Sequence, residues 1–146
     1  MCKKNIDEPI ALVYYTDSTL AQTSRRSVDM QYDSKIPIYL QVIDSIKTDI
    51  INERIKCGQK LPSSRELAVT YTINPNTAAR VYQELEREGV CYTKRGMGTF
   101  VTEDEGVIAM LKKEMAEEAL DVFLKSISEL GISIDEAIEL LKQREE

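Results

Sequence analysis

The sequence predicts a mainly α-helical fold that includes one small β-hairpin and ends in a two-helix tail. Three observations support this prediction: apolar residues recur every three or four positions in several segments, two β-rich segments flank a glycine-containing turn, and the last 44 residues return to the helical pattern. A chain of 146 residues can form one modest hydrophobic core with an appended helical unit.

The first predicted helix begins at Pro37, a residue suited to the first turn of a helix. We expect it to end near Gly58, since glycine commonly terminates helices. Its apolar residues form two adjoining stripes, Ile38, Val42, Ile46 and Ile50, and Tyr39, Ile43 and Ile51.

The second predicted helix begins after Ser63, which is followed three positions later by Glu66. This spacing is typical of a capping box, in which the two residues satisfy each other's backbone amides. Leu67 and Ala68 would then face the core.

The third predicted helix is capped by Asn74, has Pro75 at its first position and ends at Gly89. Its expected core stripe is Ala78, Val81, Tyr82 and Leu85. Two β-rich segments follow, Val90–Thr93 and Thr99–Thr102. The residues between them include two glycines, which permit a tight turn, so we expect a β-hairpin with a basic tip at Lys94 and Arg95.

A long helix over residues 104–130 and a short helix capped by Ser133 and Glu136 form the predicted tail. The long helix has one broad apolar face, made of Ile108, Leu111, Met115, Ala119, Val122, Phe123 and Ile127. Exposed apolar faces mark interfaces, so we expect two tails to pack together in a homodimer. The alternative is that this helix folds back on its own domain.

The net charge of −6 conceals a division along the chain. Residues 35–102 contain ten basic and seven acidic side chains, a net charge of +3, whereas residues 103–146 contain five and thirteen, a net charge of −8. A basic domain suits a polyanionic partner, and the acidic tail would keep that partner on the basic face.

Helix, helix, short turn, helix and hairpin in this order form a winged helix-turn-helix, whose third helix suits the DNA major groove. Asn76, Thr77 and Arg80 share the face opposite its core stripe and are residue types that read base edges. Basic residues on either side of this helix would contact the DNA phosphates, Arg65 on one side and Lys94 and Arg95 on the other. Ser63 and Ser64 are further candidate contacts beside Arg65.

Two plainer interpretations of these residues stay open at this point. Arg80 could pair with Glu84 on a solvated helix surface, as residues four apart often do. The Lys94-Arg95 pair could simply keep an exposed hairpin soluble. Neither interpretation alone explains why basic residues gather in three consecutive parts of the domain.

Several motifs in the same order resemble the GntR family of transcription regulators, and its YtrA subfamily in particular. The resemblance covers residues 35–102 and rests on Pro37-Ile38-Tyr39-Leu40-Gln41, Lys60-Leu61-Pro62-Ser63-Ser64-Arg65-Glu66-Leu67-Ala68, Asn74-Pro75-Asn76-Thr77, Tyr82-Gln83-Glu84-Leu85-Glu86-Arg87-Glu88-Gly89 and Arg95-Gly96-Met97-Gly98-Thr99-Phe100-Val101. Other branches place an arginine where this chain has Pro75, so their base preference does not carry over.

The resemblance implies a dimeric regulator that binds a pseudo-palindromic operator in double-stranded DNA, as a repressor of its own or a transporter operon. It implies DNA contacts at Arg65, Asn76, Thr77, Arg80, Arg95 and Gly96. The tail is too short to enclose a sensor pocket within one subunit, which leaves the space between subunits for an unidentified small-molecule effector.

Other classes of protein are less consistent with the sequence. A helical adaptor without DNA affinity is the principal alternative. No enzymatic activity, cofactor or metal is expected, because the chain has no histidine and its three cysteines, Cys2, Cys57 and Cys91, form no CxxC pair. Cys91 alternates with Val90 and Tyr92, which favours a buried thiol over a redox sensor.

The predicted organisation has three parts: a disordered N-terminal extension over residues 1–34, a DNA-binding domain over 35–102 and a dimerisation tail over 103–146. Met30 lies just before the first patterned residues, so residues 1–29 are interpreted either as an upstream extension or as sequence that is not native to the protein. No apolar run is long enough for a membrane span or an export signal, and we expect a cytoplasmic protein.

Overall fold

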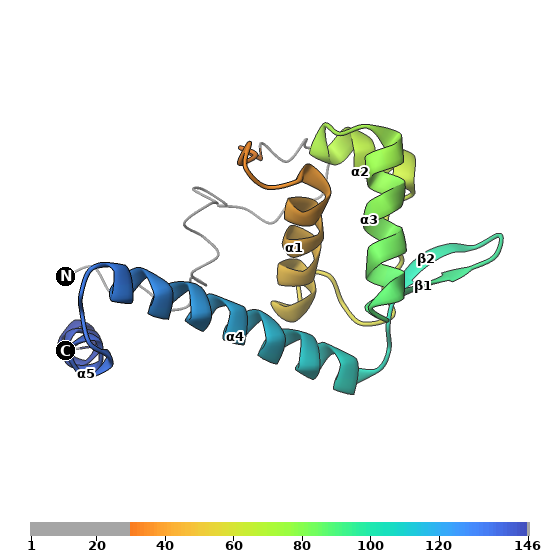
Figure 1. Ribbon diagram of the computed structural model, residues 1–146. Helices are drawn as coiled ribbons and strands as arrows, with labels where there is room; N and C mark the ends of the chain where they lie inside the picture. Colours follow the sequence, from red (N-terminus) through yellow and green to blue (C-terminus); the bar gives the residue numbers. More distant parts are fainter. Residues whose placement is uncertain (1–29, 146) are drawn as a thin grey trace, which may run out of the picture. The chain divides into compact units, whose positions relative to one another are not determined.

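The computed structural model describes residues 30–145, which form two compact units, one ending at Leu111 and the other beginning at Lys112. The fold is mainly helical with one two-stranded antiparallel hairpin, as predicted (Figure 1). Most of the predicted N-terminal extension, residues 1–29, lies outside the described residues. No helix within residues 30–145 is long and apolar enough to cross a membrane.

Helix α1 (Ile38–Ile51) supplies one side of the core of the first unit through Val42, Ile43, Ile46 and Ile50, all buried. The prediction that it extends to Gly58 is wrong. The helix ends seven residues earlier because Glu53 takes a left-handed conformation, with φ +58°, and the amides of Arg54 and Ile55 both donate to the carbonyl of Asp49. These bonds close a tight turn that the apolar pattern does not reveal.

Residues 30–36 precede α1 and are held against the first unit. The buried side chain of Gln41 donates to the carbonyls of Asp33 and Ile36 and accepts from the Asp33 amide, at 2.7–2.9 Å. The Tyr32 hydroxyl donates to the carbonyl of Tyr71 at 2.6 Å. The last residues of the predicted extension are therefore anchored to the domain that follows them.

Helices α2 (Ser64–Tyr71) and α3 (Pro75–Arg87) begin where the capping patterns predict. Leu67 and Ala68 of α2 are buried, and so is the predicted stripe of α3, which consists of Ala78, Val81, Tyr82 and Leu85. Helix α3 packs against both α1 and α2 and contacts the hairpin, so it is the central element of the first unit (Figure 1).

Strands β1 (Cys91–Lys94) and β2 (Gly98–Val101) form the hairpin, each displaced by one residue from its predicted start. Cys91 pairs with Val101 and Lys94 with Gly98. The backbone at 58–61 follows the other edge of β2: the amide of Leu61 donates to the Thr99 carbonyl at 2.8 Å, and the amide of Val101 donates to the Gln59 carbonyl at 2.9 Å. The hairpin is thereby tied to the chain just before α2.

The tail consists of α4 (Glu105–Glu129) and α5 (Ile134–Glu145), and the boundary between the two units lies within α4. In the second unit Ile127 of α4 and Ala137 of α5 are the buried apolar residues. The predicted capping box is confirmed, since the amide of Glu136 donates to the Ser133 hydroxyl at 3.3 Å and the Ser133 amide to the Glu136 carboxylate at 2.8 Å.

Candidate nucleic-acid interface

The start of α2 presents hydrogen-bonding groups on a rigid frame. The Ser63 hydroxyl accepts from the Glu66 amide at 3.3 Å, and the Glu66 carboxylate accepts from the Ser63 amide at 2.7 Å, which completes the predicted capping box. Hydrogen bonding of the carboxylate to the Ser63 backbone and side chain, together with the nearby charge of Lys60, lowers the pKa of Glu66. Ser64 is partly buried and Arg65 is exposed, so the arginine is available to a partner at the N-terminus of the helix.

The first turns of α3 carry the residues predicted to read base edges. Asn74 caps the helix, with its side-chain oxygen accepting from the Asn76 amide at 2.8 Å. Asn76 and Arg80 are exposed and Thr77 is partly buried, and all three lie off the buried stripe. The exposed face continues to Gln83, one turn further along, a residue that the sequence analysis did not select. The sequence could have indicated Gln83, because it lies three positions after Arg80 and therefore on the same side of the helix.

Arg80 does not pair with Glu84 in this structure. Glu84 forms its ion pair with Arg87, three residues further along the same helix. The guanidinium of Arg80 instead lies over the ring of Tyr39 in α1, with its carbon 3.8 Å from the ring centroid. The ion-pair alternative for Arg80 is therefore not observed, and the side chain is oriented by an aromatic ring from another helix.

A hydrogen bond between the chain before α2 and the middle of α3 sets the relation between these two helices. The Tyr82 hydroxyl donates to the Pro62 carbonyl at 2.5 Å. Burial raises the pKa of Tyr82, so the hydroxyl stays protonated and able to donate at physiological pH. The starts of α2 and α3, where Arg65 and Asn76 lie, are thus held in one arrangement.

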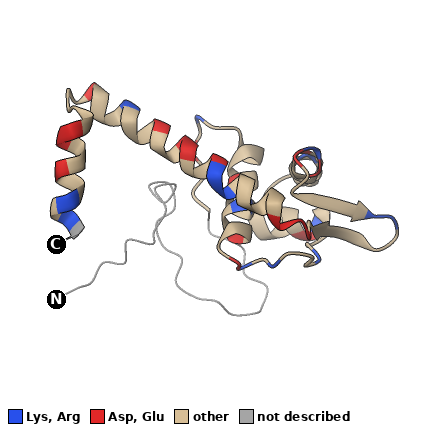
Figure 2. Cartoon of the chain, turned by 90° about the horizontal axis from the view of Figure 1, so that it is seen from below, with Lys and Arg blue, Asp and Glu red and all other residues tan. Residues whose placement is uncertain are grey.

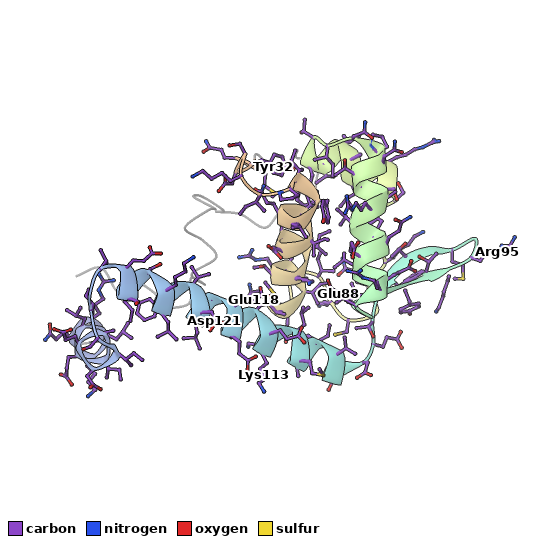
Figure 3. The ribbon with its side chains drawn as sticks, viewed as in Figure 1. Tyr32, Glu88, Arg95, Lys113, Glu118 and Asp121 are labelled. Carbon is purple, nitrogen blue, oxygen red and sulfur yellow. The ribbon has the colours of Figure 1, made fainter. Side chains whose placement is uncertain are left out.

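The hairpin carries a basic tip on a stiff stem. The rings of Tyr92 and Phe100 stack across the strands with centroids 5.9 Å apart, and the ammonium of Lys94 lies about 5.5 Å from the Tyr92 ring. Arg95 is exposed at the turn and its side chain extends away from the strands (Figure 3). Gly96, with φ +77°, supplies the left-handed position that this turn requires.

Figure 2 shows basic residues at the tip of the hairpin and a succession of acidic residues along α4. This agrees with the segment charges, which are positive over residues 35–102 and strongly negative over residues 103–146. The basic groups of the first unit that face solvent include Arg65, Arg80, Lys94 and Arg95. Groups of one sign on a rigid domain attract a polyanion at long range.

Lys60 joins this basic group, although the sequence analysis did not select it as a contact residue. Its backbone forms a bridge with Phe100 of β2, and its side chain lies across Gly98. A Cβ added at Gly98 would lie 2.7 Å from the Lys60 Cε, so the glycine makes this close approach possible. Lys60 therefore lies between the start of α2 and the hairpin. In the sequence, the only indication of a role for Lys60 is its place shortly before Pro62 and Ser63.

The two described cysteines have different environments. Cys91 is buried at 3% exposure, and this burial raises the pKa of its thiol to about 12. Its protonated sulfur is a poor nucleophile, which supports the structural role over an oxidant sensor. Cys57 is exposed, and no group of three or more potential metal ligands occurs within residues 30–145.

The tail residues predicted to form an interface are divided between buried and exposed positions. Leu111 is buried within the first unit and Ile127 within the second, so each already has neighbours in the single chain. Ile108, Met115, Ala119 and Phe123 are partly buried, and Val122 is 59% exposed. Further apolar side chains of the tail are exposed: Met110, Leu120, Leu124, Leu130, Ile134, Ile138, Leu140 and Leu141.

Comparisons with known proteins agree with this arrangement. Residues 38–101 match the family described as "Bacterial regulatory proteins, gntR family". The chain is 41% identical to the HTH-type transcriptional regulator YhcF of Bacillus subtilis, over 79% of this chain and 95% of that protein. It is 36% identical to the HTH-type transcriptional repressor YtrA of the same organism, over 75% of this chain and 85% of that protein.

The same relationship is found among solved structures. A GntR family transcriptional regulator from Listeria monocytogenes is 38% identical, with a TM-score of 0.71 over 77% of this chain and 98% of that one. These relatives are transcription regulators and not enzymes, and the winged helix-turn-helix and the similarity to YtrA agree with the sequence-based predictions. The chain therefore belongs to the GntR family of bacterial regulatory proteins and is a DNA-binding transcription regulator.

Proposed function

We propose that this regulator is a cytoplasmic, dimeric repressor that binds a pseudo-palindromic operator of its own or a transporter operon. Residues 35–102 form the DNA-binding domain in this proposal, and residues 103–146 form the dimerisation tail. The observation that carries the DNA-binding part of the proposal is that three groups of proposed contact residues belong to one unit: the start of α2, the exposed face of α3 and the hairpin tip. The Tyr82–Pro62 hydrogen bond joins α3 to the chain before α2, and the backbone pairing of residues 58–61 with β2 joins that chain to the hairpin.

The proposed division of labour follows from the chemistry of each group. Asn76, Thr77 and Arg80 of α3 read base edges in the major groove, because their side chains offer amide, methyl and guanidinium groups that match particular bases. Phosphates are contacted by the start of α2 and by the hairpin, through Ser63, Ser64, Arg65, Lys94, Arg95 and the backbone at Gly96. Lys60, which lies between these two regions, adds a further phosphate contact.

The repressor assignment is supported by the similarity to YtrA, which is a transcriptional repressor. A regulator that covers its operator through two half-sites excludes polymerase from the same DNA. Dimerisation is supported by the many exposed apolar side chains of α4 and α5, such as Leu120 and Val122. A two-fold dimer matches a two-fold operator.

Two substitutions test which residues read bases and which contact phosphates. The affinity of each variant is measured for two duplexes of equal length: one that the wild-type chain retains from a random pool, and one of random sequence. Arg80→Ala should lower affinity for the retained duplex by about 5- to 150-fold, the cost of one bidentate base contact, with little effect on random DNA. Lys94→Ala should weaken binding to both duplexes by the same factor and reduce the salt dependence.

Arg54→Ala is the control, because Arg54 is an exposed arginine of the first unit that pairs with Asp49 beyond the end of α1, and its loss leaves the Glu84–Arg87 pair intact. We expect the control to keep the wild-type ratio of affinities for the two duplexes. Equal losses on both duplexes for Arg80→Ala and Lys94→Ala would contradict the division between base reading and phosphate contact.

A further inference from the structure

Tyr39 belongs to the first turn of α1, a helix that carries none of the residues predicted to contact DNA, yet its ring contacts one of them. The carbon of the Arg80 guanidinium lies 3.8 Å from the centroid of the Tyr39 ring. This is a van der Waals distance, so the guanidinium rests on the ring, where the negative face of the π-system attracts the cation. The ring is partly buried, whereas Arg80 is exposed.

The helix that carries Tyr39 is anchored on both sides. Next to it in α1, Gln41 holds residues 33–36 through three hydrogen bonds, and Val42 and Ile43 pack in the core. Helix α1 also packs directly against α3, which carries Arg80. The ring is therefore carried by a helix whose backbone is fixed relative to α3.

No carboxylate competes with the ring for Arg80 among the described ion pairs. Glu84, the acidic residue one turn along α3, is paired with Arg87. The direction of the Arg80 side chain is therefore set by Tyr39. A guanidinium that stacks through its face keeps its N–H donors at its edge, and these are the groups that bond two acceptors of a guanine at once.

We propose that Tyr39 is a positioning residue for operator recognition, which holds the Arg80 guanidinium in its reading orientation before DNA arrives. The inference rests on the proposed base-reading role of Arg80. A free arginine loses rotamer freedom when it binds, and this loss weakens binding. Because the ring already restricts the rotamers of Arg80 in the free protein, less rotamer freedom is lost when DNA binds. The ring also keeps the N–H donors from pointing in directions that cannot reach a base.

The test is a double-mutant cycle on the full-length chain, with the retained operator duplex and a random duplex. Tyr39→Leu should lower operator affinity by about two- to tenfold, the usual effect of one additional side chain ordered on binding, and should leave random-duplex affinity unchanged. In the Arg80→Ala background, Tyr39→Leu should cause no further loss. Tyr39→Phe keeps an aromatic ring and should retain wild-type affinity.

A second measurement reports the contact without DNA. In NMR spectra of the free protein, the side-chain Nε–H signal of Arg80 should carry a ring-current shift in the wild type and in Tyr39→Phe, and should lose it in Tyr39→Leu. Thermal unfolding of each variant identifies any loss of affinity that comes from unfolding. If Tyr39→Leu lowered affinity for both duplexes equally and in proportion to its loss of thermal stability, the positioning role would be contradicted.

The outcomes separate this inference from the proposed function. If Arg80→Ala removes operator discrimination but Tyr39→Leu does not, Arg80 reads DNA without help from the ring, and only the positioning role is overturned. If Tyr39→Leu costs the same with and without Arg80, the tyrosine acts by another route, and the inference also fails. If Arg80→Ala leaves discrimination intact, the base-reading role and the positioning role are both wrong.

Discussion

At the residue scale, Gly98 combines a backbone conformation that favours glycine with a close side-chain neighbour. Its φ of +120° lies in a region that other residues rarely adopt, and the Lys60 side chain occupies the space beside it. Gly96 in the same turn has φ +77°, but nothing lies within 4 Å of an added Cβ there. The two glycines therefore differ in the room available to a side chain as well as in backbone conformation.

We predict that Gly98→Ala destabilises the first unit by about 1–3 kcal/mol, the usual cost of holding a residue in a rare backbone conformation. Gly96→Ala should cost about 1 kcal/mol, because the left-handed region is less restrictive and the site is open. Chemical unfolding followed by circular dichroism measures both. A larger loss of stability for Gly96→Ala than for Gly98→Ala would show that the Lys60 contact and the φ of Gly98 do not constrain the hairpin.

At the element scale, the same capping box begins one helix in each unit. Ser63 and Glu66 begin α2, and Ser133 and Glu136 begin α5. Each serine satisfies a backbone amide that the first turn of a helix leaves without a partner. The pair of motifs offers a matched test, because the same substitution can be made in both units.

We predict that Ser63→Ala destabilises α2 by about 1 kcal/mol, or roughly fivefold in the protection of its amides against hydrogen exchange. Ser133→Ala should reduce protection in α5 by a similar factor. Exchange measured segment by segment follows each helix separately. If neither substitution changed protection in its own helix, the capping boxes would not contribute to helix stability.

The elements that could be predicted from the sequence are those with local signals. Capping residues predict the starts of α2 and α3, and the glycine-containing turn predicts the hairpin to within one residue. The end of α1 could not be predicted, because it depends on the left-handed Glu53 and on a turn that gathers two amides on the Asp49 carbonyl. Such a turn has no strong residue signature.

The candidate site shows the same division between local and long-range information. Asn76, Thr77 and Arg80 could be selected because helical periodicity places them off the buried stripe of α3. The contacts of Arg80 with Tyr39 and of Lys60 with Gly98 join residues about 40 positions apart in the chain. Only tertiary packing brings these side chains together, so no spacing in the sequence indicates them.

At the scale of the whole molecule, the exposed apolar side chains of the tail require a partner in the proposed dimer. Val122 of α4 is 59% exposed, whereas Leu111 and Ile127 are already buried within the chain. Val122 is therefore the predicted interface residue whose substitution disturbs the single chain least. Ser128, about 120° around the same helix from Val122 and outside the predicted apolar face, offers an exposed position for a matched change of charge.

We predict that Val122→Glu converts the dimer to a monomer and weakens operator binding, because a charge in an apolar interface is costly and a monomer occupies a single half-site. Ser128→Glu adds the same charge and should leave the dimer intact. Sedimentation of both variants gives the molecular mass. A dimer that survives Val122→Glu unchanged would place the interface elsewhere.

A dimer of this chain should bind a specific two-fold DNA site through two copies of the first unit, and selection from a pool of random duplexes measures this binding. The full-length chain is mixed with the pool at about 50 and 200 mM salt, and the retained DNA is sequenced. We predict an enriched two-fold motif with a constant half-site spacing and a total yield that falls steeply with salt. Folded protein that enriches no sequence, or that retains DNA equally at both salt concentrations, would contradict this prediction.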